Sequence, residues 1–209
     1  YDDMLRHDVR PLTLGGDHTL SLPILRAMAK KHGPLVLLHI DAHADINSHM
    51  FGEEIAHGTP FRRAFEEELL DANQVFQIGL RGTGYTAEDF DWASERGFQV
   101  VQAEQLWHQS AAPLMDQIRQ QIGPRPVYLS FDIDSLDPAY APGTGTPEIG
   151  GLTSIQALEI IRGCRGLSLV GADLVEVSPP YDTNGNTALL AANLLFEMLC
   201  VLPGVAYRD

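Results

Sequence analysis

The chain has 209 residues, of which 28 are acidic and 14 are basic, so its formal net charge at pH 7 is −14. This charge repels nucleic acids and anionic lipid surfaces, and no apolar run approaches the roughly 20 residues that a membrane-spanning helix needs. We therefore expect neither nucleic-acid binding nor membrane insertion. The length and a hydrophobic fraction of 44% suit one globular domain with a core of its own.

Short apolar runs and helical periodicity alternate along the chain. The apolar runs predict strands at residues 9–14, 34–40, 74–80, 98–101, 126–131 and 167–174. Helical spacing predicts helices at residues 20–30, 61–70, 86–96, 112–122, 153–163 and 187–202. Thr153 and Gln156 have the spacing of a capping box. The alternation predicts a three-layer α/β fold, with a mostly parallel sheet covered by helices on both faces, in a single domain over residues 1–209.

Polar clusters follow three of the predicted strands. They are Gly15-Gly16-Asp17-His18, Asp41-Ala42-His43-Ala44-Asp45 and Asp132-Ile133-Asp134. In open parallel sheets, ligands bind beyond the carboxyl ends of the strands, so these clusters should meet at one edge. An extended chain alternates its side chains, which places Asp41, His43 and Asp45 on one side. The spacing therefore predicts a convergent set of side chains.

Two imidazoles and four carboxylates in one cleft indicate bound metal. Taken singly, each motif is also typical of a turn or a salt-bridged pair. Together the carboxylates would bury several uncompensated charges at a cost of several kcal/mol each, and two divalent cations would balance them. Oxygen donors with a minority of histidine and no thiolate favour Mn²⁺ over structural zinc, although Fe²⁺, Co²⁺ and Zn²⁺ also fit such a site.

The three motifs resemble the metal signatures of the arginase and agmatinase (ureohydrolase) superfamily. The resemblance covers nearly the whole chain, including residues 141–148 and 173–180. It implies an arginase-like fold and two Mn²⁺ ions per subunit. One ion would be bound by His18, Asp41, Asp45 and Asp132, and the other by Asp41, His43, Asp132 and Asp134, with Asp41 and Asp132 bridging.

The resemblance also implies hydrolysis of a linear guanidino compound to urea and an amine. Two metal ions would lower the pKa of a bound water to roughly 7, and the resulting hydroxide would attack the guanidinium carbon. His57 matches a family histidine suited to deliver a proton to the leaving amine. Glu176 would pair with the guanidinium through charge-assisted hydrogen bonds. Asn47 would join His57 and Glu176 in contacting the substrate.

The identity of the substrate depends on loops around its far end, chiefly residues 47–55. Together with residues 57–63 and 81–85, this loop resembles guanidinobutyrase and guanidinopropionase most, then agmatinase, and arginase less. A guanidino acid such as 4-guanidinobutyrate presents a carboxylate that would need Arg81 or a hydroxyl such as Tyr85. Agmatine is the alternative, and its ammonium would need Glu53 or Glu54. The residues leave both choices open.

Two further alternatives belong to other classes. Relatives of this fold that deacetylate acyl-amines use one zinc ion and would not need both His18 and Asp45. Members of the family also carry a further N-terminal segment, and this sequence opens at Tyr1 with its first methionine at Met4. We therefore expect a fragment or a misassigned start, and an inactive or regulatory isoform is the non-enzymatic alternative. Family trimers and hexamers imply a homo-oligomer.

The two cysteines, the two tryptophans and His39 are predicted to be packing residues. Cys164 and Cys200 lie in apolar helical contexts, which predicts two buried thiols and a reducing, cytoplasmic environment. Trp92 and Trp107 are predicted to pack in the core, and His39 is predicted to pack inside a strand.

Overall fold

The computed structural model describes residues 1–82 and 88–206. Its six strands form one sheet in the order β1-β6-β5-β2-β3-β4, and each neighbouring pair is parallel. The strands are β1 (Leu12–Leu14), β2 (Leu35–Ile40), β3 (Leu70–Leu80), β4 (Gln99–Gln102), β5 (Pro126–Asp132) and β6 (Ser168–Val175). Because all run in the same direction, their carboxyl ends lie at one edge of the sheet, where the predicted polar clusters begin.

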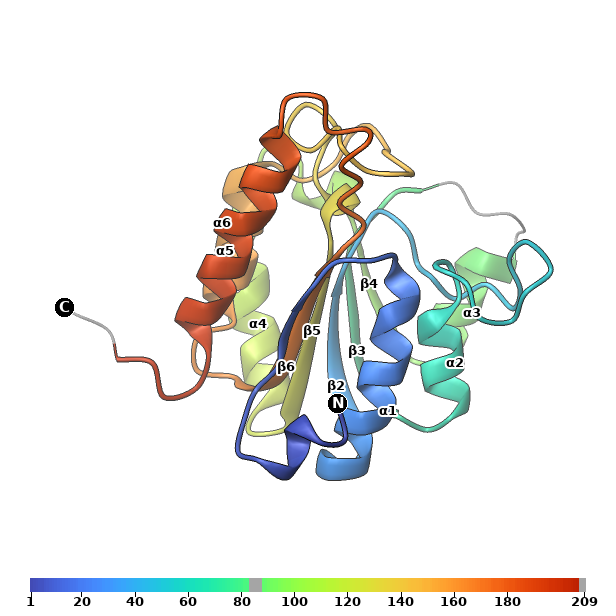
Figure 1. The fold of residues 1–209 in the computed structure, drawn as a ribbon, viewed down its shortest axis with the longest axis vertical. Helices are drawn as coiled ribbons and strands as arrows, with labels where there is room; N and C mark the ends of the chain where they lie inside the picture. Colours follow the sequence, from blue (N-terminus) through green and yellow to red (C-terminus); the bar gives the residue numbers. More distant parts are fainter. Residues whose placement is uncertain (83–87, 207–209) are drawn as a thin grey trace.

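Helices cover both faces of the sheet (Figure 1). On one side lie α1 (Ser21–His32), α2 (Pro60–Glu66) and α3 (Glu88–Glu95), and on the other lie α4 (Ala112–Ile122), α5 (Ser154–Gly163) and α6 (Asn186–Val201). Short 3₁₀ turns at Met4–Arg6, His18–Leu20, Ala103–Leu106 and Ile133–Ser135 lie in the connections. The predicted three-layer fold is confirmed. Within the described ranges, no helix combines the length and apolarity needed to cross a bilayer.

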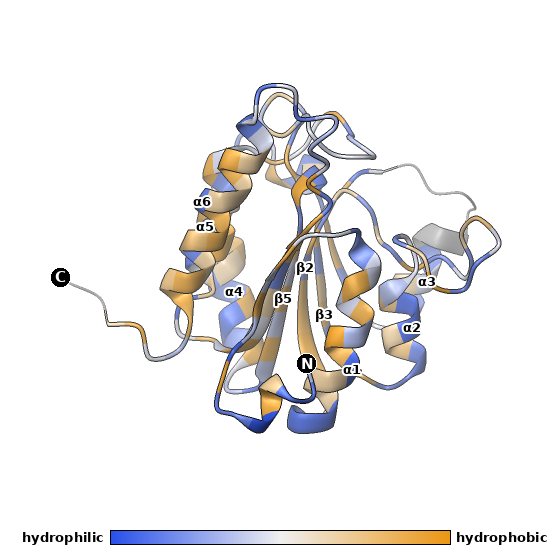
Figure 2. Cartoon of the chain, viewed as in Figure 1, coloured by the Kyte–Doolittle hydropathy of each residue, from blue (hydrophilic) through white to orange (hydrophobic). Residues whose placement is uncertain are grey.

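The central strands are buried on both faces, and successive residues join different cores. In β2, Val36, Leu38 and Ile40 pack in a cluster with α4, α5 and α6, whereas Leu35 and Leu37 pack in a second cluster with α1 and α2. Figure 2 shows long apolar stretches in these strands and mixed faces on the surrounding helices. Continuous burial explains why such strands read as uninterrupted apolar runs.

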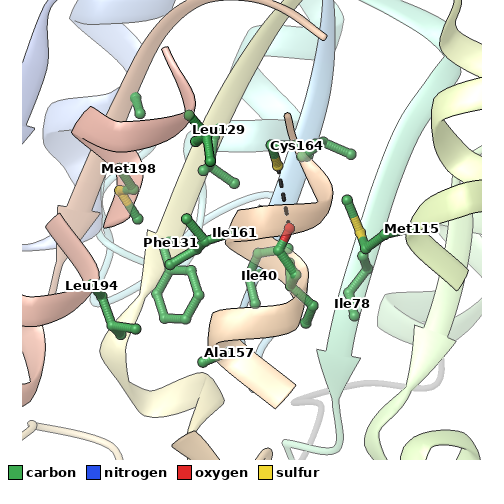
Figure 3. Packing of buried hydrophobic residues seen from close by; sticks show 14 of the residues in the cluster. Ile40, Ile78, Met115, Leu129, Phe131, Ala157, Ile161, Cys164, Leu194 and Met198 are labelled. Carbon is green, nitrogen blue, oxygen red and sulfur yellow. Dashed lines mark hydrogen bonds between the residues drawn. The ribbon is translucent and has the colours of Figure 1, made fainter. Parts of the chain in front are cut away.

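The larger cluster fills the space between the sheet and α4–α6 (Figure 3). Phe131 of β5 packs among Ile161 of α5 and Leu194 of α6. The Cys164 thiol is buried there and donates to the carbonyl oxygen of Ile160 at 3.4 Å. Burial raises the pKa of this thiol to about 12. The prediction of a buried thiol is confirmed at Cys164, while Cys200 is only partly buried.

The boundaries of two helices agree with the sequence predictions, although only one of them has a side-chain cap. The helix at 112–122 begins and ends as predicted, and Thr153 caps α5 in a full capping box with Gln156. The helix predicted at 61–70 is wrong in its second half: α2 ends at Glu66, the chain turns through Glu68 with φ of 58°, and β3 already begins at Leu70. Of the helix predicted at 86–96, residues 86 and 87 lie outside the described part of the chain.

The two tryptophans differ in burial. Trp92 is buried and contacts Phe65 and Phe98 edge-on, as predicted. Trp107 is not a core residue, since 51% of it is exposed. Its indole N–H donates to the carbonyl oxygen of Gly150 at 2.9 Å, which holds the ring at the surface against a glycine turn. Residue type alone suggested packing, whereas the turn at Gly150 determines where the ring lies.

Candidate metal centre and adjoining pocket

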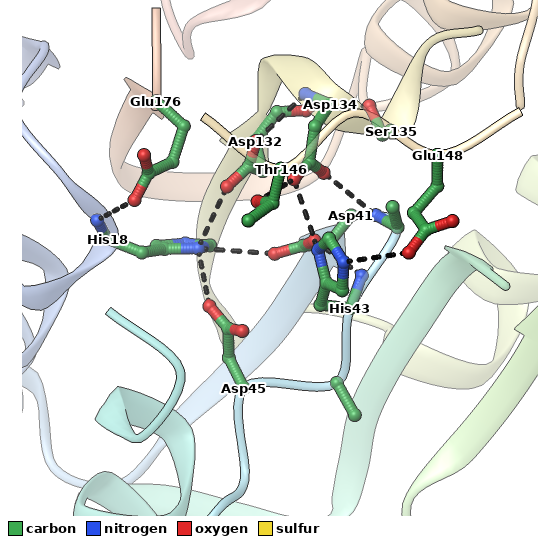
Figure 4. Close-up of polar contacts among 12 residues, drawn as sticks. His18, Asp41, His43, Asp45, Asp132, Asp134, Ser135, Thr146, Glu148 and Glu176 are labelled. Carbon is green, nitrogen blue, oxygen red and sulfur yellow. Dashed lines mark hydrogen bonds and ion pairs between the residues drawn. The ribbon is translucent and has the colours of Figure 1, made fainter. Parts of the chain in front are cut away.

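Six side chains from three strand ends converge at the carboxyl edge of the sheet (Figure 4). His18 starts the 3₁₀ turn that follows β1, Asp41 directly follows β2, and Asp132 is the last residue of β5. The structure brings together all of the predicted ligands, which are His18, Asp41, His43, Asp45, Asp132 and Asp134. The alternation that suggested convergence therefore corresponds to the observed geometry.

His18 lies at the buried side of this cluster. Its Nδ1 atom is 2.8 Å from Oδ2 of Asp45, 3.2 Å from Oδ2 of Asp41 and 3.3 Å from Oδ2 of Asp132. The atom is buried, yet it is aligned for a hydrogen bond with none of the three oxygens. Ligand atoms about 2 Å from a common cation lie about 3 Å from one another. The arrangement therefore fits a shared cation better than a hydrogen bond.

His43 lies at the open side of the cluster. Its Nδ1 atom is 3.1 Å from Oδ2 of Asp134 and 3.6 Å from Oδ1 of Asp41, and 25% of the side chain is exposed. Its Nε2 atom faces Glu148 at 3.8 Å. His43, Asp41 and Asp134 form one of the groups whose donor atoms could hold a metal ion. Asp41 thus contacts both histidines and joins the two sides.

Backbone amides hold three of the carboxylates in place. The amides of His43 and Asp134 donate to Asp41 and Asp132 at 2.6 and 2.8 Å, and the amide of Ala42 donates to Asp134 at 3.1 Å. Asp45 has a left-handed backbone with φ of 53°. Such a conformation is costly for a residue with a side chain and persists where the surroundings enforce it, as happens at functional sites.

The charges of the cluster shift its pKa values strongly. Burial lowers the pKa of His18, but the carboxylates of Asp132, Asp41 and Asp45 outweigh burial and hold this pKa well above its ordinary value. For His43 burial is likewise outweighed, by Asp134 and Asp41, and the pKa rises to about 12.

Two of the carboxyl groups, those of Asp132 and Asp134, have raised pKa values, because burial and neighbouring carboxylates disfavour their ionised forms. Burial and the negative charges of Asp134 and Asp41 raise the pKa of Asp132 well above its ordinary range. The four carboxylates therefore repel one another, and two protonated imidazoles would balance only two of their four negative charges. Two divalent cations carry the four positive charges that four ionised carboxylates require. The donor set, with nitrogen and oxygen atoms and no sulfur, fits such a pair.

A pocket of about 1080 Å³ opens beside the cluster. The pocket is lined both by candidate ligands and by apolar side chains. These residues include His43, Asp45, Asp132, Asp134, Asn47, His57, Glu176, Met50, Phe51, Leu80, Trp107 and Ile149. The three residues predicted to contact substrate therefore line the same cavity as the ligands.

His57 and Glu176 lie beside each other in the lining of this pocket. Nδ1 of His57 is 3.6 Å from Oε1 of Glu176, which also accepts from the backbone amide of His18 at 2.8 Å. Burial raises the pKa of the Glu176 carboxyl. The ring of Phe51 stacks on the ring of His57, with ring centroids 5.9 Å apart. The backbone N–H of Asn47 donates to the carbonyl oxygen of Gly58 at 3.0 Å. The loop of residues 47–58 is thus closed on itself beside the metal ligands.

The structure describes three of the residues suggested as partners for the far end of the substrate, and it supports none of the three as a direct partner. Arg81 does not offer a free guanidinium, because its N–H groups donate to six backbone carbonyl oxygens, those of Gly79, Asp134, Ser135, Leu136, Glu148 and Ile149. Although Arg81 lines the pocket, these contacts do not support its pairing with a substrate carboxylate. Glu53 and Glu54 are exposed and do not line the pocket. Tyr85 lies outside the described residues.

His39 has a larger role than the sequence suggested. It is buried in β2 as predicted, but its Nε2 atom is 2.7 Å from Oδ2 of Asp41. Its donor atoms also lie within reach of those of His18 and Asp45. The spacing from His39 to Asp41 was a usable signal, since residues two apart in a strand share a face.

Comparison with known proteins identifies the family. The family model described as "Arginase family" matches residues 1–200. The chain is 71% identical over 208 residues to a guanidinobutyrase of Pseudomonas aeruginosa, covering 100% of this chain and 65% of that protein. It is 62% identical over 205 residues to a mitochondrial agmatinase of Gallus gallus, covering 98% of this chain and 60% of that protein.

A solved structure with the same fold is the proclavaminate amidino hydrolase of Streptomyces clavuligerus. It is 43% identical, its TM-score is 0.88, and the match covers 94% of this chain and 67% of that chain. The chain spans less than two thirds of the length of the two sequence relatives above. The extent of the family match and the fold agree with the strand-end clusters, and the chain belongs to the arginase family.

Proposed function

We propose that this protein hydrolyses a guanidino compound to urea and an amine at a site with two divalent cations. The observation that carries the proposal is the buried Nδ1 atom of His18, which faces three carboxylates and is hydrogen-bonded to none of them. His18, Asp41, Asp45 and Asp132 would hold one ion, and Asp41, His43, Asp132 and Asp134 the other. The donor set favours Mn²⁺.

When bound, two such cations would lower the pKa of water and supply hydroxide at neutral pH. The protein's own residues would orient the substrate and move protons. Glu176 would pair with the guanidinium, since its carboxylate lines the pocket and is partly withdrawn from water. His57 would give a proton to the departing amine, because its imidazole lies on the same wall, 3.6 Å from Glu176.

We propose 4-guanidinobutyrate or a related guanidino acid as substrate. The support is the 71% identity to a protein named guanidinobutyrase and the 62% identity to a human protein named guanidino acid hydrolase. With Arg81 engaged by carbonyl groups, a substrate carboxylate would rely on neutral donors such as Asn47. A specific observation favours agmatine as the second candidate: the carboxylates of Glu104 and Glu148 line the pocket and would attract an ammonium group.

The assay that tests these proposals measures urea released from 4-guanidinobutyrate, 3-guanidinopropionate, agmatine and arginine by the Mn²⁺-loaded chain. We expect the highest kcat/KM for a guanidino acid. Metal-stripped protein serves as the control, with Mn²⁺, Co²⁺ and Zn²⁺ added back separately. Full activity without metal contradicts the two-metal proposal. Two bound ions without urea release from any of the four compounds would instead support an inactive or regulatory isoform.

The proposal extends to assembly and location. We propose a homo-oligomer, either a trimer or a hexamer, on the basis of the family resemblance, and a cytoplasmic location, which suits the free thiol of Cys164. Light scattering on the eluted protein measures its mass, and a mass near 22.9 kDa would contradict oligomerisation.

A further inference from the structure

A row of buried polar residues crosses the sheet beneath the candidate metal ligands. His39 of β2 is paired in register with Gln77 of β3 on one side and with Ser130 of β5 on the other, and Ser130 is paired with Asp173 of β6. All four side chains are fully buried in strands that are otherwise mainly apolar. We call these four residues the polar row. Buried polar groups are costly unless they are hydrogen-bonded, so the direction of each hydrogen bond matters.

On one side of the row, the hydrogen bonds fix the tautomer of His39. Nε2 of Gln77 donates to the carbonyl oxygen of Ala44 at 2.8 Å, which identifies that atom as the amide nitrogen. The same nitrogen is 3.0 Å from Nδ1 of His39, which must therefore accept. Nε2 of His39 then carries the ring's proton and donates to Oδ2 of Asp41 at 2.7 Å. Neither ring nitrogen of His39 is left to bind a metal ion.

On the other side, the same reasoning fixes Nε2 of His18 as a donor. The Ser130 hydroxyl donates its only proton to Oδ1 of Asp173 at 2.8 Å. Its oxygen is also 2.8 Å from Nε2 of His18, and it can only accept there. Asp173 accepts two more hydroxyl protons on Oδ2, from Ser21 and Tyr128. Nε2 of His18 therefore carries a proton, and Nδ1 is the nitrogen that can present a lone pair to the carboxylate cluster.

We propose that the polar row is a positioning device that selects one tautomer in each of two histidines. Through Ser130 and Asp173, it makes Nδ1 of His18 available to a cation. Through Gln77, it makes His39 a proton donor to Asp41 and excludes His39 from the ligand set. This inference rests on the proposed two-metal site, and it identifies Asp173 and Gln77 as positioning residues.

Substitution of Asp173 gives the most direct test. In Asp173→Asn the new amide can donate to Ser130, whose hydroxyl proton can then turn toward His18. The proton of the imidazole would move to Nδ1 and oppose metal binding there. We expect one of two Mn²⁺ ions to bind about 10- to 100-fold more weakly while the other is unaffected, as is typical when a residue that orients a metal-binding histidine is changed.

The matched control is Tyr128→Phe. It removes another hydroxyl from the same carboxylate but leaves the contacts from Asp173 to Ser130 and from Ser130 to His18 intact. Both ions should bind this variant within about threefold of wild type, below the range expected for a lost orienting contact. Ser130→Ala, which removes the connecting oxygen itself, should weaken the same single ion and serves if Asp173→Asn does not fold. Free Mn²⁺ measured by electron paramagnetic resonance gives both affinities.

The tautomers can also be read in the wild-type chain, independently of any variant's stability. Long-range ¹H–¹⁵N spectra of the Zn²⁺-loaded, histidine-labelled protein distinguish protonated from unprotonated ring nitrogens. We expect an Nε2–H tautomer for His18 and for His39, with a metal-shifted Nδ1 only at His18. Ser130→Ala and Gln77→Leu assign the two signals, because each removes one partner.

Three results would overturn the inference. They are an Nδ1–H tautomer at either histidine, wild-type affinity for both ions in Asp173→Asn or Ser130→Ala, and an equal loss in Tyr128→Phe. If the wild-type chain binds two Mn²⁺ ions and releases urea, each of these results overturns only this inference, and the proposed function stands. A wild-type chain that binds no Mn²⁺ overturns the proposed function itself and this inference with it.

Discussion

The two histidines of the candidate metal centre lie in contrasting surroundings. The His18 side chain is 1% exposed and contacts three carboxylates, with Ser130 behind it. The His43 side chain is 25% exposed, faces the pocket and has Glu148 beyond it. Both have raised pKa values for the same reason, which is that nearby carboxylates outweigh burial. The difference lies in what else depends on each ring.

The difference in surroundings predicts different roles for the buried side of the cluster, at His18, and the open side, at His43. On the buried side, hydrogen bonds reach from His18 through the sheet, so the ring contributes to the charge balance of the fold as well as to metal binding. On the open side, His43 belongs to the pocket wall, where substrate and water have access. We therefore expect changes at His18 to affect stability and changes at His43 to affect chemistry.

The largest effect is expected from removing Asp132, a carboxylate proposed to bridge the two ions. Asp132→Ala should lower kcat/KM for urea release by on the order of 10³-fold or more, because metal activation contributes several kcal/mol. Metal content, measured by mass spectrometry, should fall at both sites. Asp116→Asn, at an exposed carboxylate on α4, is the control and should retain both ions. Two tightly bound ions in Asp132→Ala would contradict its bridging role.

The second prediction tests the contrast directly through stability. In the metal-free protein, His18→Ala leaves three carboxylates facing one another without a cation, which should cost about 3–5 kcal/mol. His43 is partly exposed, so His43→Ala should cost less, roughly 1–2 kcal/mol. Urea unfolding of both variants, stripped of metal, gives the two free energies of unfolding. Equal losses, or a larger loss for His43→Ala, would remove the distinction between the two sides.

The third prediction concerns pH. His18 and His43 hold protons at neutral pH in the metal-free protein because their pKa values are raised, to about 12 for His43. A metal ion must displace these protons, so Mn²⁺ affinity should rise with pH by up to about tenfold per pH unit for each proton released. Calorimetry in two buffers of different ionisation enthalpy counts the protons. Binding that is independent of pH between 6 and 9 would contradict the raised values.

The sign of the stability effect follows from the same shift. A histidine whose folded pKa is raised stabilises the metal-free fold fully below its unfolded pKa of about 6.5, and this stabilisation is lost as the pH rises toward its folded pKa. For His43 the window runs from about 6.5 to about 12. Raising the pH should therefore weaken this contribution to the metal-free fold while it strengthens metal binding, and unfolding with and without Mn²⁺ separates the two trends.

The sequence was sufficient to predict which side chains converge at the candidate metal centre, because their signal is local. Asp41, His43 and Asp45 occupy alternate positions directly after an apolar strand, so their place at the carboxyl edge of the sheet follows from the end of that strand. The parallel α/β fold follows equally from the alternation of elements. Residues whose role depends on strand register could not be predicted in this way. Ser130 and Asp173 are 43 positions apart, and their contact exists only because β5 and β6 pair in one register.

The contacts of Arg81, which lies in a loop, likewise could not be predicted from the sequence. An arginine near a pocket is a reasonable partner for a carboxylate, and nothing in its neighbouring residues contradicts that. Its partners are carbonyl groups as many as 68 positions away, which the fold brings around the guanidinium. Long-range backbone contacts of this kind leave no pattern in the side chains.

The smallest expected effect tests the open side alone. Glu148 lies 3.8 Å from Nε2 of His43 and is about one third exposed, so solvent screens most of its attraction. Glu148→Gln should therefore leave both metal affinities and the unfolding free energy within about 0.5 kcal/mol of wild type, in the range of exposed ion pairs. If agmatine is a substrate, removing this carboxylate from the pocket should raise the KM for agmatine by about two- to fivefold, because an ion pair of this exposure contributes up to about 1 kcal/mol. The KM for 4-guanidinobutyrate should fall or stay constant. Steady-state kinetics on the two compounds measures this ratio, and an equal change in both KM values would show that Glu148 does not sense the charge of the substrate's far end.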